Sequence, residues 1–148
     1  MSVRRILAAA AAVLLMALSV GGQAQAITPE QRKALNAAER WLVIVDAERY
    51  ANAWAMAAES LKASVPQQEF RDGIGKIRKD YGRVVLRKSE KIGFVGETPE
   101  PDDPSGAAKE GMQIAILFDT KFAGNKRATE EVMLEKDGLW RVAGYNIR

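Results

Sequence analysis

The chain has 148 residues, with 22 Lys or Arg against 19 Asp or Glu, and it contains neither Cys nor His. Without Cys there can be no disulfides, thiolate nucleophiles or Cys-ligated metal sites. Without His the commonest general base and transition-metal ligand are missing, so we expect no metal, no cofactor and no triad hydrolase.

A cleaved export signal is predicted over residues 1–26. Two arginines near the N-terminus precede an apolar run from Ile6 to Val20, and Ala24 and Ala26 are the small residues that signal peptidase requires. The run is shorter than the roughly 20 apolar residues of a membrane span. We therefore expect cleavage after Ala26 and a product without a membrane span.

The remaining chain, residues 27–148, is predicted to be a single domain. Its net charge falls from +3 to +1 because two arginines leave with the signal. This charge provides no field to attract nucleic acid, which we do not expect as a partner. The arginine pair fits both the general secretory and the twin-arginine route, and both lead to the periplasm or the extracellular space.

Helices are predicted for the first half of this domain. Thr28-Pro29-Glu30-Gln31 is a capping box with Pro at the first helical position, and apolar residues then recur at helical spacing to about Asp46. A second short helix is expected from Tyr50 to Leu61. Ser64-Val65-Pro66-Gln67 repeats the start signature for a third helix, which Gly82 ends as a left-handed C-cap.

Strands are predicted after Gly82, where the apolar period changes to two. An irregular strand through Val95 is followed by a loop rich in Pro and acidic residues. The remaining elements are a strand at 112–120 and a hairpin of 130–136 with 139–147 that turns at Asp137-Gly138. Helices followed by strands predict an α+β domain, with the helices packed on one face of an antiparallel sheet of about four strands.

Aromatic residues are the first candidates for a site. They have two interpretations: they line a pocket for a small apolar ligand, or they form the core between the helices and the sheet. The candidate pocket residues are Trp41, Tyr50, Trp54, Phe118, Trp140 and Tyr145.

Polar candidates are few. Asp46, Arg87 and Asp119, together with Tyr50, are the groups that an acid–base site could use. The alternative is structural: Asp46 as a helix-end residue, Asp119 pointing away from the core, and Arg87 as the ion-pair partner of one of them. The basic stretch containing Lys76, Arg78, Lys79, Arg83, Arg87, Lys88 and Lys91 is typical of a solvated face.

Several segments resemble a known family. Ala38-Glu39-Arg40-Trp41-Leu42, Leu117 to Phe122 and above all Trp140-Arg141-Val142-Ala143-Gly144-Tyr145 near the C-terminus resemble the exported bacterial proteins of the domain of unknown function 4019 family. That family is similar to the cystatin-like and nuclear-transport-factor-2-like group. The resemblance implies a cone-shaped fold whose curved sheet wraps around long helices and often leaves a pocket.

Three hypotheses for function follow. The first is a non-enzymatic module that binds a small apolar ligand or an envelope protein through a pocket or sheet face. The second is a small isomerase or dehydratase that uses Asp46, Tyr50 or Asp119, as the resemblance to a group containing ketosteroid isomerases implies. The third is an interaction domain that dimerises across the open sheet.

Overall fold

The computed structural model describes residues 26–148. Residues 1–25 of the predicted signal sequence, including Ala24, lie outside this range, and Ala26 is the first residue within it. Among the helices of the described range, none is long and apolar enough to cross a membrane.

The first half of the domain is helical, as predicted, but it contains four helices in place of the three expected. Thr28 caps the first: its Oγ1 accepts from the Gln31 N–H at 3.2 Å, and its own N–H donates to Gln31 Oε1 at 2.8 Å, which confirms the capping box. The helices are α1 (Pro29–Asp46), α2 (Tyr50–Ala55), α3 (Glu59–Ser64) and α4 (Gln67–Tyr81).

Two details of the helices differ from the prediction. The second predicted helix is interrupted, because Ala58 is extended and its N–H donates to the carbonyl of Val142 at 2.8 Å. Ser64 does not cap α4; its hydroxyl donates to the carbonyl of Ser60, and α4 begins after Pro66 without a side-chain cap. Gly82, with a φ of 79°, ends α4 at the predicted position.

The second half of the domain is an antiparallel sheet in which each strand pairs with the next in the chain. Gly138, with a φ of 66°, turns the predicted hairpin, and two register shifts account for the irregular first strand. The strands are β1 (Val84–Val95), β2 (Gln113–Phe122), β3 (Arg127–Asp137) and β4 (Leu139–Ile147). The α+β prediction is therefore confirmed.

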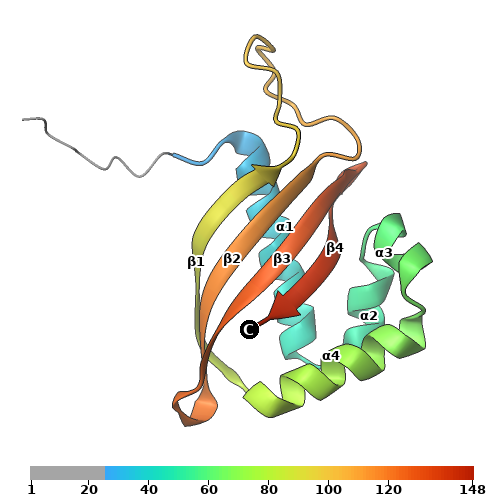
Figure 1. The fold of residues 1–148 in the computed structure, drawn as a ribbon, viewed down its shortest axis with the longest axis vertical. Helices are drawn as coiled ribbons and strands as arrows, with labels where there is room; N and C mark the ends of the chain where they lie inside the picture. The colour runs from blue at the N-terminus through green and yellow to red at the C-terminus, as the bar shows by residue number, and fades with distance from the viewer. Residues whose placement is uncertain (1–25) are drawn as a thin grey trace, which may run out of the picture.

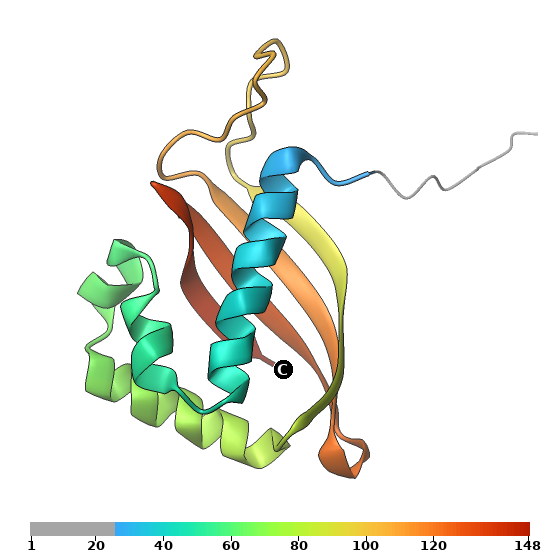
Figure 2. The same cartoon turned by 180° about the vertical axis from the view of Figure 1, so that it is seen from behind.

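The helices cover one face of the sheet and one of its edges. Figure 2 shows α1 lying across the curved sheet, and both ribbon views place α3 and much of α4 beyond the β4 edge. The predicted loop between β1 and β2 projects at one end of the molecule (Figure 1). Alternate residues of β2 and β3 are buried against α1, as the period of two requires.

Candidate functional site

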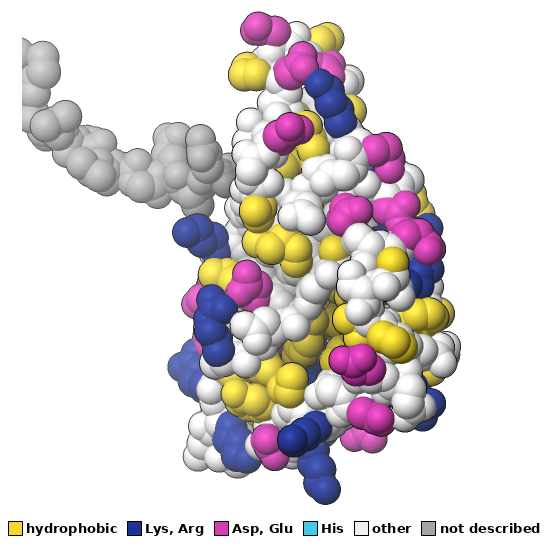
Figure 3. Space-filling view, turned by 45° about the vertical axis from the view of Figure 1, so that its right-hand side comes forward, with side chains coloured by type: hydrophobic (Ala, Val, Ile, Leu, Met, Phe, Trp, Pro, Cys, Tyr) yellow, Lys and Arg dark blue, Asp and Glu magenta, His cyan; other side chains and the backbone are white. Residues whose placement is uncertain are grey.

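A groove of about 560 Å³ lies between α3–α4 and the β3–β4 side of the sheet. In the space-filling view, hydrophobic side chains line the hollow, and acidic side chains lie near it (Figure 3). The apolar lining residues are Leu61, Val65, Phe70, Ile74, Ile77, Met133, Ala143 and Tyr145. The others are Ser60, Ser64, Glu69, Gly73, Gln113 and Glu135.

Both α3 and α4 contribute to the helical wall of the groove, and α4 provides most of it. Phe70 and Ile74 are one turn apart and buried, and they pack into the main core beneath the groove. Ile77, three residues after Ile74, is 38% exposed and forms part of the rim. An apolar surface of this kind, left open to water, is the usual mark of a binding site.

A second pocket of about 650 Å³ opens where α1 ends against α4. Its lining is largely polar and includes Asp46, Glu48, Tyr50, Arg78 and Arg83. Between this pocket and the groove lies a cluster of buried charged side chains. Arg78 and Asp46 contribute both to the pocket wall and to the cluster.

Glu130 of β3 is the centre of the buried cluster and is fully inaccessible to water. Its Oε1 accepts from Arg78 Nη1 at 2.8 Å, from Arg87 Nη2 at 3.1 Å and from the Tyr145 hydroxyl at 2.6 Å. Its Oε2 accepts from Arg87 Nε and from Thr120 Oγ1, each at 2.6 Å. Four side chains from four elements thus converge on one carboxylate.

Asp46, at the end of α1, completes the cluster. Arg78 Nη2 donates to its Oδ1 at 2.7 Å, and Arg87 binds both carboxylate oxygens, at 2.7 and 2.9 Å. Two arginines and two carboxylates make the cluster neutral. Throughout residues 26–148, every buried side-chain nitrogen and oxygen has a hydrogen-bond partner, as a stable buried network requires.

The surroundings of the cluster raise the pKa of both Arg87 and Tyr145. Burial lowers the pKa of Arg87, but the hydrogen bonds and charges of Asp46 and Glu130 outweigh it and raise the pKa above the usual value. Burial raises the pKa of Tyr145, and the charge of Glu130 raises it further, so this phenol stays protonated as a donor. Guanidinium groups bind both carboxylates through ion pairs. The cluster therefore offers structural ion pairs and no free base.

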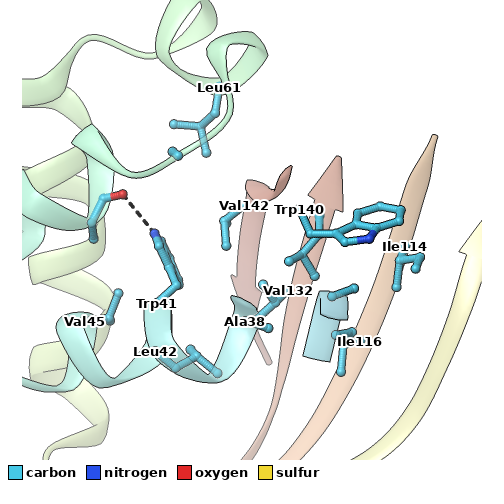
Figure 4. Close-up of a cluster of buried hydrophobic side chains, with 14 of the residues drawn as sticks. Ala38, Trp41, Leu42, Val45, Leu61, Ile114, Ile116, Val132, Trp140 and Val142 are labelled. Carbon is cyan, nitrogen blue, oxygen red and sulfur yellow. Dashed lines mark hydrogen bonds between the residues drawn. The ribbon is translucent and has the colours of Figure 1, made fainter. Parts of the chain in front are cut away.

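The six candidate aromatic residues do not line a common cavity. Trp41, Phe118 and Trp140 lie in the core, where Figure 4 shows Trp41 and Trp140 among the aliphatic side chains of α1 and the sheet. The Trp41 indole donates to the carbonyl of Ala53 at 2.9 Å.

The Trp140 indole donates to buried Glu30 at 2.9 Å. The other three aromatics are only partly buried. The Trp54 indole donates to the carbonyl of Val65 at 2.8 Å. Tyr50 lines the polar pocket and Tyr145 lines the groove.

The structure brings two of the three polar candidates together. Asp46 and Arg87 form the bidentate pair described above, while Asp119 lies on the other face of the sheet and pairs with Arg127. The prediction that the basic stretch forms a solvated face is wrong for two of its members. The side chains of Arg78 and Arg87 are only 6% and 13% exposed, because they form ion pairs with acidic side chains inside the domain.

Glu130, Arg78 and Thr120 were not among the site residues predicted from the sequence. Arg78 follows Phe70 and Ile74 at helical spacing, so the apolar stripe of α4 continues into an arginine. Glu130 occupies an inward position of β3 between Ala128 and Val132. In both α4 and β3 a charged residue occupies a position of the otherwise apolar, inward-facing pattern. This was the signal in the sequence that two buried charges meet.

Within residues 26–148, no group of three or more acidic side chains is arranged to hold a metal ion. The family model described as protein of unknown function DUF4019 matches residues 37–145 of the chain. No curated protein and no solved structure matches it.

Proposed function

We propose that this chain, which belongs to the DUF4019 family, is an exported binding module without catalytic activity. The groove between α3–α4 and the β3–β4 side holds an apolar part of a ligand or partner. The observation that carries the proposal is the apolar lining of the groove, which the fold leaves open. Each 100 Å² of this surface that a ligand covers contributes about 2.5 kcal/mol before the costs of association.

The buried cluster supports binding in preference to acid–base catalysis. A general base needs a carboxylate that can take up a proton, whereas both oxygens of Asp46 accept hydrogen bonds from arginine. Asp119 is on the opposite face of the sheet and is paired with Arg127. Of the three groups considered for an isomerase or dehydratase, only Tyr50 faces a pocket without an ion-pair partner.

Export is the second part of the proposal. The position of α1 supports it, since its Thr28 cap follows the expected cleavage point at Ala26 by two residues. A signal peptidase would thus release a chain that begins almost at its first helix. N-terminal sequencing of the protein from the cell envelope or medium should give Ile27 as the first residue, and an intact Met1 on the purified protein would contradict the proposal.

A neutral environment-sensitive dye, N-phenyl-1-naphthylamine, tests the groove. We expect saturable enhancement of its fluorescence by the purified protein. Ile77→Glu places a charge on the apolar rim and should weaken binding by about tenfold or more. Because Ile77 is partly exposed, this substitution leaves the core intact.

Leu86→Glu is the matched control. Leu86 is 64% exposed on β1, does not line the groove, and receives the same new charge. Dye binding by this variant should equal that of the unmodified protein. The groove assignment fails if the dye does not bind, or if Ile77→Glu and Leu86→Glu bind it equally.

A further inference from the structure

The charge of the groove restricts the chemistry of its occupant. Glu69 of α4 and Glu135 of β3 stand among its lining residues, which include no Lys or Arg. Glu69 has no ion pair within the described part of the chain, and Glu135 accepts a hydrogen bond from Ser60 at 2.9 Å. An apolar occupant that also carries positive charge is therefore favoured over an anionic one such as a fatty acid.

The sheet presents an unpaired edge in the same groove. Thr129 and Arg148 exchange both backbone N–H···O bonds, at 2.7 and 3.0 Å, at the end of the β3–β4 ladder. Hydrogen-bonded and non-hydrogen-bonded pairs alternate along an antiparallel ladder. Tyr145, which pairs with Val132 three positions earlier, is thus in a non-hydrogen-bonded pair. Its backbone N–H and C=O point away from β3, toward the free side.

One backbone group of the protein already forms a hydrogen bond with this edge. The N–H of Ala58 donates to the Val142 carbonyl from the free side of β4. Beyond that contact, no other backbone hydrogen bond reaches the free side of β4 within residues 26–148. An added strand would extend the same pairing from Ala143 toward the C-terminus, over a stretch that lines the groove.

Gly73 is the third observation. It lies inside α4, where glycine costs about 1 kcal/mol relative to alanine, and a Cβ added there meets no atom within 4 Å. The fold itself does not require glycine at this position. What glycine provides is bare backbone in the groove wall, opposite the β4 edge, and therefore room for another main chain.

We infer that the groove binds an extended peptide segment of alternating apolar and cationic residues, which pairs with the free edge of β4. This inference rests on the proposed function of the groove and specifies its ligand. The main chain of the peptide bonds to the backbone of Tyr145, its apolar side chains contact Phe70 and Ile74, and its Lys or Arg side chains lie near Glu69 and Glu135.

Three short synthetic peptides test the inference by isothermal titration calorimetry on the purified protein. One alternates Val and Lys, the second alternates Val and Glu, and the third is the Val–Lys peptide with N-methyl groups on the edge-facing amides. The Val–Lys peptide should bind, and each of the other two should bind at least about tenfold more weakly. Equal affinity of the Glu peptide or of the N-methylated peptide would overturn the inference.

Gly73→Leu provides the matched variant in the protein. Leucine favours the helix, so α4 should become more stable, while its side chain fills the groove and weakens peptide binding by about tenfold or more. Gln68→Leu, at an exposed position of the same helix outside the groove lining, should leave peptide affinity unchanged. Unchanged affinity in Gly73→Leu would refute the position of the peptide.

The dye experiment separates the two proposals. If the neutral dye binds and Ile77→Glu abolishes this binding, but none of the peptides binds, the peptide inference is wrong and the groove function stands. If neither the dye nor the peptides bind, both are wrong.

Discussion

Replacing Glu130 by Gln is the sharpest test of the buried cluster. The substitution keeps the shape of the side chain but removes a negative charge that accepts five hydrogen bonds, three of them from arginines. Asp46 is then left to balance two guanidinium groups whose side chains are 6% and 13% exposed. Loss of one partner from a buried ion pair costs about 3–5 kcal/mol, a large part of the 5–15 kcal/mol that stabilises a typical domain.

Urea unfolding followed by tryptophan fluorescence and circular dichroism measures this cost. We expect Glu130→Gln to lower the unfolding midpoint without changing the m-value. Glu131→Gln is the control, because Glu131 is the next residue, points to the other face and pairs with the exposed Arg148; its effect should stay within about 0.5 kcal/mol.

A double variant tests the electrostatic origin of the effect. Arg87→Met combined with Glu130→Gln leaves Arg78 and Asp46 as one neutral pair, so it should be more stable than Glu130→Gln alone. The reasoning is refuted if Glu130→Gln costs less than about 1 kcal/mol, or if adding Arg87→Met lowers the stability further.

Three other substitutions give predictions for stability. Thr28→Ala removes the α1 cap and should lower the free energy of unfolding by about 1 kcal/mol in urea titrations. Burial and Glu130 raise the pKa of Tyr145; above about pH 10 the unfolded chain loses a proton that the native state keeps, so stability falls with rising pH, less steeply in Tyr145→Phe. Burial raises the pKa of Glu30, but hydrogen bonds from Lys33 and Trp140 lower it by more. Glu30→Gln should therefore be destabilising at pH 7, and the difference should shrink as the pH falls below about 4.

Local signals in the sequence predicted most of the fold. The Thr28 capping box, the stripe ending at Asp46, and Gly138 at the hairpin each act within a few residues, so their effects can be derived from neighbouring side chains alone. One of the two errors in the helices arose where a distant segment intervenes, whereas the other, at Ser64, arose from a local bond of its hydroxyl to the carbonyl of Ser60. Ala58 leaves the helix because its N–H bonds to Val142 on β4, and no periodicity near Ala58 encodes that partner.

The site was less predictable because it depends on pairing between distant residues. Asp46 and Arg87 were candidates, and Arg87 was expected to pair with an acidic residue, but the choice between Asp46 and Asp119 depends on which face each occupies. Arg78 was assigned to a solvated face since charge runs are usually exposed. Its burial depends on Glu130, 52 residues away in the sequence, so only the fold reveals it.

The cluster and the groove are connected through α4. This helix has no side-chain N-cap and contains Gly73 and Gly75, so interactions within the helix stabilise it only weakly. Arg78 fixes it to Asp46 on α1 and to Glu130 on β3, one turn beyond Ile74 on the groove wall. The same helix thus contributes Arg78 to the buried ion pairs and several residues to the groove wall. A substitution in the cluster that shifts α4 would therefore also change the width of the groove.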